Sequence, residues 1–285
     1  MDRGEIKILP KEKWPRLLKE INDPPEKLYI RGTLPPDDYK WLCVIGSRKF
    51  TPYGRDACET ILEGLRGQKV VIVSGLALGI DSLSHRKALE ISLNTVAVPG
   101  SGLNDKVLYP SSHRNLAHKI IEAGGCLLSE FEPDFEATLY SFPQRNRIMA
   151  GLCSAVLVIE AGAKSGTSIT ARLATEYNRD VLAVPGSIFS ENSSGTNMLI
   201  KTGAYVIRSA EDLREALGLE EPSREDKFRD CSEEEKMIAE LLNTPLPKDE
   251  LIRLSKLSVI EAQILLSAME IKGMIKESYG EIRLN

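Results

Sequence analysis

The sequence has little of what metal sites, disulfide frameworks and membrane spans are built from. Its 285 residues include five cysteines, none in a C-x-x-C pair, and three histidines. Cys43 and Cys126 lie inside apolar runs, which favours buried free thiols over disulfides or a zinc site. No window is apolar for long enough to cross a bilayer, and the start, MDRGEIKILPKEKWP, has no apolar signal region. We therefore expect a cytoplasmic protein without a metal, a cofactor or a membrane partner.

Familiar catalytic and nucleotide-binding signatures are also missing. The stretch GAKSGTS (162–168) only resembles G-x-x-x-x-G-K-[ST], with Thr167 at the lysine position, and no G-x-G-x-x-G follows a predicted strand. The histidines lack metal-binding spacing, and Asp81 is better explained as a helix N-cap than as a general base. Glu160 ends a predicted strand without an evident catalytic partner. Nucleotide hydrolysis and nicotinamide chemistry are not predicted, and we do not expect an enzyme.

Neither sign of charge dominates the chain. The formal net charge is −4, but residues 41–218 hold eighteen bases and eighteen acids, whereas residues 219–285 hold ten bases and fifteen acids. The acidity therefore belongs to the carboxyl-terminal part. A neutral domain can still bind a polyanion if its bases converge in the fold.

From residue 41 onward, short β-branched runs alternate with longer amphipathic ones. Strands are predicted at 41–45, 69–74, 94–98, 126–130, 155–160, 180–184 and 204–207, and helices at 56–65, 82–91, 114–123, 168–178 and 210–217. Such alternation favours right-handed crossovers and a mostly parallel sheet with helices on both faces. The fold class predicted for 41–218 is α/β, a doubly wound sheet.

The flanking segments differ from this domain. Residues 1–40 are punctuated by proline and are expected to pack on the main domain. Residues 219–232 are charged and aperiodic, which is typical of a linker. Residues 233–285 show three short helical patterns followed by two strand-like runs around Tyr279-Gly280, a pattern that predicts a small winged-helix module.

Glycine and small hydroxyl residues follow nearly every predicted strand. The stretches are GSRKFTPYG (46–54), SGLALGID (74–81), PGSGLNDKVLYP (99–110), EAGAKSGTSITA (160–171) and PGSIFSENSSGTN (185–197). Carboxyl ends of parallel strands meet at one edge of the sheet, where ligands bind. Glycine lets backbone amides approach a ligand closely, and phosphate suits such loops best. Tight turns alone also call for glycine, but five such loops on one edge favour an anion site.

The helix that opens FPQRNRIMAGL (142–152) carries Arg145 and Arg147 in its first turn. The amino end of a helix already has partial positive charge, so bases there are unfavourable unless an anion is supplied. Either an external phosphate supplies it, or one arginine instead holds neighbouring loops through Glu130 or Glu160. Sequence alone leaves both possibilities open.

Together these motifs resemble the DNA-processing protein A family (DprA, also called Smf). WPRLLKEINDPPEKLYIRG (14–32) and the strand-end stretches above, with LLSEFEP (127–133), SGTSITARLA (165–174) and AVPGS (183–187), follow the order and spacing of that family. The resemblance implies an extended Rossmann-like core, a homodimer, and binding of single-stranded DNA without strong sequence preference. It also implies loading of RecA recombinase onto that strand during natural transformation.

The resemblance places the DNA-binding residues at the ends of several strands. They are Ser47, Arg48, Lys49, Gly75, Arg145, Asn146, Arg147, Ser165, Gly166, Thr167 and Ser168. Lys106, Arg114 and Lys164 are added as DNA-binding candidates because they could compensate for bases that are missing elsewhere. Tyr53, Tyr109 and Phe142 are candidate stacking groups for bases, or else core residues. Leu78 and Ser111 replace bases that the family often has, so affinity could be lower or the path of the strand could differ.

Two rival functions follow from the same fold. Phosphoribohydrolases that release bases from nucleoside monophosphates use a PGGxGTxxE loop, but Thr170 stands here where the acid is needed. A mononucleotide sensor is the third possibility. Separately, the helix predicted at 258–272 is nearly all apolar or acidic, with one base at its very end, so it is expected to contact protein or to stabilise a dimer rather than to read a duplex.

Overall fold

Two compact units make up the chain, Met1–Glu221 and Pro222–Asn285. The computed structural model describes residues 4–163, 165–220, 231–242, 244–272, 274–278 and 280–284. Most of the predicted linker at 219–232 therefore lies outside the described residues. None of the helices within these ranges is long and apolar enough to cross a membrane.

The first unit is built on one sheet of nine strands among the described residues. In spatial order they are β1 (Ile6–Ile8), β2 (Tyr29–Gly32), β6 (Cys126–Ser129), β5 (Asn94–Ala97), β4 (Val70–Ser74), β3 (Lys40–Ile45), β7 (Ala155–Val158), β8 (Asp180–Ala183) and β9 (Tyr205–Val206). In this order, neighbouring strands from β6 to β9 are parallel to each other. Strand β2 is antiparallel to both of its neighbours, β1 and β6. The predicted mostly parallel α/β sheet is confirmed, with two strands added by the first 40 residues.

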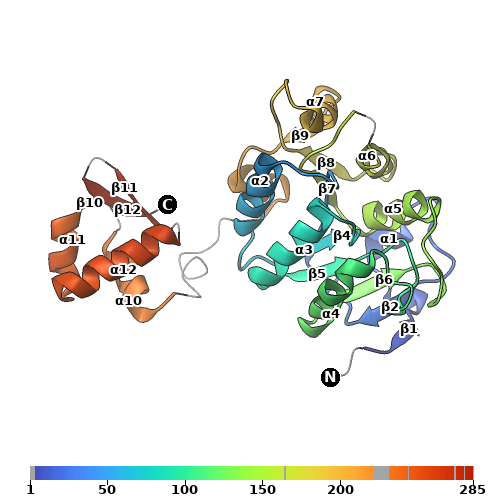
Figure 1. Ribbon diagram of the computed structural model, residues 1–285, viewed down its shortest axis with the longest axis horizontal. Coiled ribbons are helices and arrows are strands. Elements are labelled where there is room, and N and C mark those ends of the chain that lie inside the picture. The colour runs from blue at the N-terminus through green and yellow to red at the C-terminus, as the bar shows by residue number, and fades with distance from the viewer. Residues whose placement is uncertain are drawn as a thin grey trace. The chain divides into compact units, whose positions relative to one another are not determined.

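Helices cover both faces of this sheet (Figure 1). They are α1 (Arg16–Lys19), α2 (Pro52–Glu63), α3 (Ile80–Glu90), α4 (Arg114–Glu122), α5 (Ser141–Leu152), α6 (Thr167–Glu176), α7 (Ser194–Lys201) and α8 (Ala210–Ala216). Alternate residues of β3 face opposite layers: Trp41 and Cys43 pack in the core with α1 and α5, whereas Leu42 and Val44 pack with α2 and α3. Burial on both faces explains why the strands are continuous apolar runs.

The order of the strands creates a switch point between β3 and β7. The chain adds β4, β5 and β6 on one side of β3, then returns to add β7, β8 and β9 on the other. The loops after β3 and β7 therefore leave the sheet in opposite directions, and a crevice opens between them at the carboxyl edge. Topology alone places the ligand site of such a sheet here.

An acid–base cluster fastens the amino-terminal strands to the sheet. The guanidinium of Arg31, on β2, donates to Asp105 Oδ1 at 2.6 Å, and His118 Nε2 lies 3.0 Å from the same oxygen. The hydrogen bond from Arg31 lowers the pKa of Asp105 to about 2. Because this pKa lies below that of an unfolded aspartate (about 3.9), the stabilisation is present above that value and is lost as the pH falls through the folded pKa.

We expect Asp105→Asn to destabilise the first unit at neutral pH. The difference from wild type should shrink as the pH falls from about 4 towards 2, because the wild-type carboxylate is then protonated as well. Urea unfolding at neutral and acid pH measures this. A difference in free energy that is the same at both pH values would contradict the assignment.

The second unit has its own core and sheet. Its helices are α10 (Glu233–Leu241), α11 (Lys248–Ser255) and α12 (Val259–Ile271), and its described strands are β10 (Leu246–Pro247), β11 (Ile275–Ser278) and β12 (Glu281–Leu284), ordered β10-β12-β11 and antiparallel. Capping boxes at Ser232 and Ser258 start α10 and α12. Ile238, Leu251, Leu266 and Ile282 are among the buried residues between them.

Candidate nucleic-acid interface

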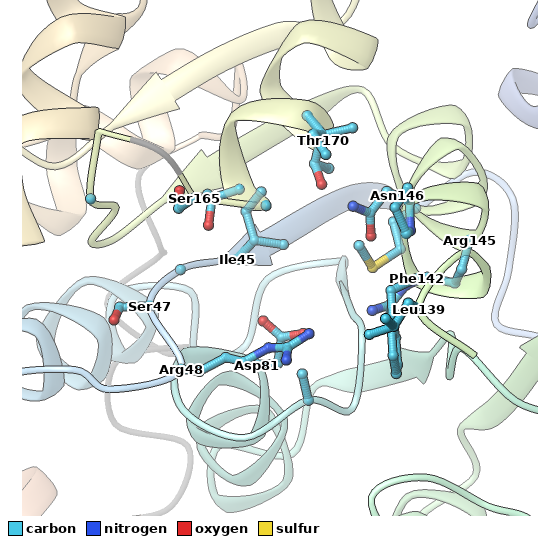
Figure 2. Close-up of a pocket in the computed structure, with 18 of the residues that line it drawn as sticks. Ile45, Ser47, Arg48, Asp81, Leu139, Phe142, Arg145, Asn146, Ser165 and Thr170 are labelled. Carbon is cyan, nitrogen blue, oxygen red and sulfur yellow. The ribbon is translucent and has the colours of Figure 1, made fainter. Parts of the chain in front are cut away.

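A cavity of about 510 Å³ lies at the switch point of the sheet. Its walls come from the loop after β3, the start of α3, the start of α5 and the loop that leads into α6. Figure 2 shows Ser165 on one side of it and Asn146 and Phe142 on the other, with Ile45 between them. Three segments that are distant in sequence therefore meet here.

Arg48 supplies an exposed cation at this cavity. It lies in the loop after β3, and its guanidinium carbon is 5.5 Å from the centroid of the Phe142 ring. Phe142 in turn lies 5.6 Å from Tyr109, at an angle of 52°. A cation above the Phe142 ring, with Tyr109 beside that ring, offers both a phosphate partner and a stacking surface.

Gly79 allows the Arg48 loop to lie close to α3. Its φ is +88°, and a Cβ there would come within 2.2 Å of the Ser47 carbonyl oxygen and 2.5 Å of the Arg48 Cα. The Ile80 amide donates to the same Ser47 carbonyl at 3.2 Å. The loop is thus held from behind by backbone, while the Arg48 side chain remains exposed.

Arg145 lines the cavity but is buried, with 4% of the residue exposed. Its guanidinium donates to the carbonyl oxygen of Val98 and lies in the field of Asp81, which is also buried. Burial raises the pKa of Asp81, whereas Arg145 acts in the opposite direction. Burial likewise lowers the pKa of Arg145, and Asp81 opposes that change. The two groups stabilise each other beneath the cavity floor.

Gly75 belongs to this buried arrangement rather than to the cavity wall. Its amide donates to Asp81 Oδ2 at 3.1 Å, and a Cβ at this position would lie 2.0 Å from the Arg145 Nη1 atom. Glycine is therefore required by the arginine that packs against it. The sequence motifs placed Gly75 among the predicted DNA-binding residues. In the structure it packs against the buried Arg145 and does not line the cavity.

Arg147 has protein partners of its own. Its guanidinium donates to a carboxylate oxygen of Glu130 and, at 2.5 Å, to the carbonyl oxygen of Asp23. Its side chain is 14% exposed. The possibility that one of the two arginines holds a neighbouring loop through Glu130 is confirmed for Arg147. The anion that offsets its position in the first turns of α5 is an internal carboxylate.

The start of α6 forms the wall opposite α5. Ser165, Gly166 and Thr167 line the cavity, and Gly166 is the N-cap of the helix. The first amides of a helix have no intrahelical acceptor and favour an anion. Ser165 Oγ is buried and has no hydrogen-bond partner among the described residues. These groups can donate to a phosphate without any cationic side chain.

Other predicted residues lie outside the cavity wall. Lys49 and Ser168 are exposed beside it, and Lys106 is exposed with its carbonyl accepting from Arg114 Nη2 at 3.1 Å. Neither Lys106 nor Arg114 lines the cavity. Lys164 lies outside the described residues. Ser47 and Asn146 do line it.

Several exposed apolar side chains escaped the sequence reasoning. Leu139 (85% exposed) and Tyr140 (86%) precede α5, and Ile188 (84%) and Phe189 (93%) follow β8. Leu139 also lines the cavity. Their position in loops at the carboxyl edge was a usable signal, but an aromatic residue in a loop is as often packed as exposed, and only the fold distinguishes the two cases.

Glu160 has a structural role beside a second pocket. This pocket, lined in part by Tyr53 and Ser187, lies on the same edge. The buried carboxylate accepts from the Thr51 amide at 2.9 Å and from its hydroxyl at 2.5 Å. It therefore satisfies the amino end of α2, where negative charge is favourable. The Tyr53 hydroxyl donates to the Pro185 carbonyl at 2.5 Å, which holds its ring against the loop after β8.

Comparison with known proteins covers most of the first unit. Residues 5–218 match the model of the family described as DNA recombination-mediator protein A. Protein Smf of Escherichia coli is 41% identical over 206 residues, which are 72% of this chain and 54% of that protein. DNA processing protein DprA of Streptococcus pneumoniae is 40% identical over 200 residues, 70% of each chain. The chain thus spans about half the length of the E. coli relative.

Solved structures agree with the sequence match. The X-ray structure of the S. pneumoniae protein superposes with a TM-score of 0.67 at 37% identity and covers 74% of each chain. A structure of DNA processing protein A from Helicobacter pylori, on its single-stranded DNA binding mode, gives a TM-score of 0.66 at 30% identity over 75% of this chain and 96% of that one. On the strength of the family match over residues 5–218 and these relatives, the chain belongs to the DNA recombination-mediator protein A family.

Proposed function

We propose that this protein binds single-stranded DNA in the cavity at the switch point of its sheet. The observation that carries the proposal is the exposed Arg48 guanidinium above the Phe142 ring, in a cavity that the amino end of α6 also lines. A phosphate can be held between the cation and the helix amides, while Phe142 and Tyr109 stack on adjacent bases. The binding mode described for the H. pylori relative supports the same class of ligand.

Single-stranded DNA fits better than a duplex for a physical reason. In a duplex the faces of the bases are stacked on one another and are not available to an aromatic side chain, whereas an unpaired strand exposes them. Backbone amides and a stacking ring do not distinguish one base from another. We therefore infer binding without strong sequence preference.

The experiment is a comparison of a labelled single-stranded oligonucleotide with its duplex over a range of salt concentrations, read by fluorescence anisotropy. We expect tighter binding of the single strand. Two phosphate contacts, from Arg48 and Lys49, correspond to a slope of about −1.4 in log affinity against log salt per protomer. Equal affinity for both forms, or tight binding of a mononucleotide and none of the long strand, would overturn the proposal.

We extend the proposal to loading of RecA recombinase onto the bound strand, as in natural transformation. The description of the family as a recombination mediator supports it. Strand-exchange assays on DNA coated with single-strand-binding protein should show faster RecA assembly when the protein is added. No acceleration by a chain that binds the strand tightly would refute this extension and leave DNA binding intact.

The rival phosphoribohydrolase function finds little support in the cavity. Among its described lining residues the one carboxylate is Asp81, which is 6% exposed and accepts from the Gly75 amide. Thr170, at the position where those hydrolases need an acid, is 2% exposed. Incubation with AMP and detection of free adenine is the direct test, and release of adenine would favour the enzyme.

We propose that the first unit forms a homodimer through the sheet edge at β9. Strand β9 is the last of its sheet, and Tyr205 and Val206 are 60% and 41% exposed. Met198, in the preceding helix α7, is 56% exposed. An exposed apolar strand edge is a site for pairing with another chain.

Tyr205→Asp should shift this dimer towards monomer, because an aspartate at the pairing edge would be desolvated without a partner. Sedimentation velocity measures the change. Ile8→Asp is the matched control, since Ile8 is 57% exposed on β1, the opposite edge strand. Loss of the dimer in the Ile8 variant but not in the Tyr205 variant would place the interface at β1 and contradict the proposal.

We also propose that the second unit, with three helices and a three-stranded sheet among its described residues, is a winged-helix module.

A further inference from the structure

Helix α12 of the second unit presents an apolar stripe on its outer side. Ile260, Ile264 and Ile271 are 71%, 67% and 87% exposed. Val259, the first residue of α12, is 59% exposed, and Leu254, near the end of α11, is 41% exposed. The opposite side of α12, with Ala262, Leu266 and Met269, is buried in the core of the unit. A helix that is apolar on both sides has a second packing partner or an unfavourable exposed surface.

The spacing of the stripe is that of a helix–helix seam. Ile260, Ile264, Ser267 and Ile271 are separated by four, three and four residues, so they lie along one side of the helix. Ser267 is exposed at the centre of the row. A small residue there lets a second helix approach closely.

The charges of α12 argue against nucleic acid as the partner. From Val259 to Ile271 the helix has two acids, Glu261 and Glu270, and no base. Glu261 accepts from the Ser258 amide and hydroxyl in a capping box, so its charge is engaged locally. A helix that reads a groove or a phosphate backbone presents several of Arg, Lys, Asn and Gln, whereas α12 presents Gln263 alone.

We propose that α12 pairs with α12 of a second copy of this chain, in antiparallel orientation. In that arrangement a two-fold axis passes midway along the stripe, so Ile264 of one helix faces Ser267 of the other, and Ile260 faces Ile271. Large side chains then pack against small ones twice by symmetry, which a closed two-fold interface requires. The flanking Gln263 lies opposite Glu270 and can donate to it. A parallel pair would instead place Ser267 against Ser267 and crowd Ile264 against Ile264.

This interface is distinct from the dimer proposed at β9, and the two can be tested in one set of full-length chains. In the Tyr205→Asp background we expect a dimer that persists through α12. Adding Ile264→Lys should convert it to monomer, because lysine remains a good helix former but cannot be buried in the seam. Glu281→Gln is the control: it makes the same change in net charge at an exposed residue of β12. Sedimentation velocity is measured for wild type, each of the two single variants, the double variant and the control, with circular dichroism to confirm equal helix content.

The outcomes separate the two proposals. A Tyr205→Asp chain that is dimeric, and monomeric only with Ile264→Lys, supports pairing through α12. A Tyr205→Asp chain that is already monomeric overturns it and leaves the β9 dimer standing. A wild-type dimer that becomes monomeric with Ile264→Lys alone supports α12 and refutes β9. A double variant that remains dimeric overturns the α12 proposal.

The orientation has its own test. Ile260→Cys and Ile271→Cys chains, both carrying Cys231→Ser, are mixed under mild oxidation. If the helices pair antiparallel, disulfides that join an Ile260→Cys chain to an Ile271→Cys chain should exceed disulfides that join two copies of the same variant. Excess of the like-with-like disulfides would overturn the antiparallel arrangement. The remaining cysteines, Cys43, Cys58, Cys126 and Cys153, are buried and do not compete.

Discussion

Arg48→Ala is expected to weaken binding of a single-stranded oligonucleotide by about 10- to 100-fold while leaving the free energy of unfolding nearly unchanged. Charge-assisted hydrogen bonds contribute about 1.5–3 kcal/mol, and each 1.4 kcal/mol is a factor of ten in affinity. Arg48 is exposed and packs over the face of Phe142. It also contributes positive charge near the buried Asp81, but Arg145 is the larger positive influence on that carboxyl and stays in place. Its removal therefore takes a cation from the cavity without leaving a buried group unpaired.

Anisotropy titrations at several salt concentrations measure this effect. The slope of log affinity against log salt should become less steep by about 0.7 for one lost phosphate contact. Arg86→Ala is the matched control, because Arg86 is an exposed arginine of α3 that does not line the cavity. Equal losses in the two variants would mean a general effect of charge, and no loss at Arg48 would remove the cavity as the binding site.

Arg145→Ala is expected to reduce the free energy of unfolding by about 1–3 kcal/mol, the cost of leaving a buried acceptor without its hydrogen-bond donor. The substitution leaves the Val98 carbonyl without its donor and removes Arg145, the larger of the two positive influences on the buried Asp81 carboxylate. It also opens space beside Gly75, whose missing Cβ accommodates the guanidinium. DNA binding should fall as well, because the cavity floor is lost.

A double-mutant cycle with Asp81→Asn separates these contributions. Asn is neutral and nearly isosteric, so Arg145→Ala should cost less in the Asp81→Asn background than in wild type. Urea denaturation gives the four free energies. Costs that simply add would show that the two groups do not interact, and an Arg145→Ala chain as stable as wild type would refute the buried role altogether.

The sequence was sufficient for the parallel part of the sheet, but not for strands β1 and β2, which the first 40 residues add. Alternation of apolar strands with amphipathic helices predicted the parallel sheet, because a strand covered on both faces must be apolar at every position. The glycine-rich stretches predicted the edge at which the site lies, because carboxyl ends of parallel strands converge there. Motif spacing then identified the family over residues 5–218.

Tertiary structure decided which of the arginines is free. In sequence, Arg48, Arg145 and Arg147 are equivalent bases in glycine-rich or helix-start motifs. In the fold, Arg145 lies against Val98 and Asp81, and Arg147 holds Glu130 and Asp23, whereas Arg48 extends over Phe142 into the cavity. The partners come from residues as far as 124 positions away. Burial and hydrogen bonding of a side chain depend on such long-range neighbours, which no local pattern records. The two arginines of FPQRNR were visible in the sequence, but their hydrogen bonds to other parts of the same chain were not.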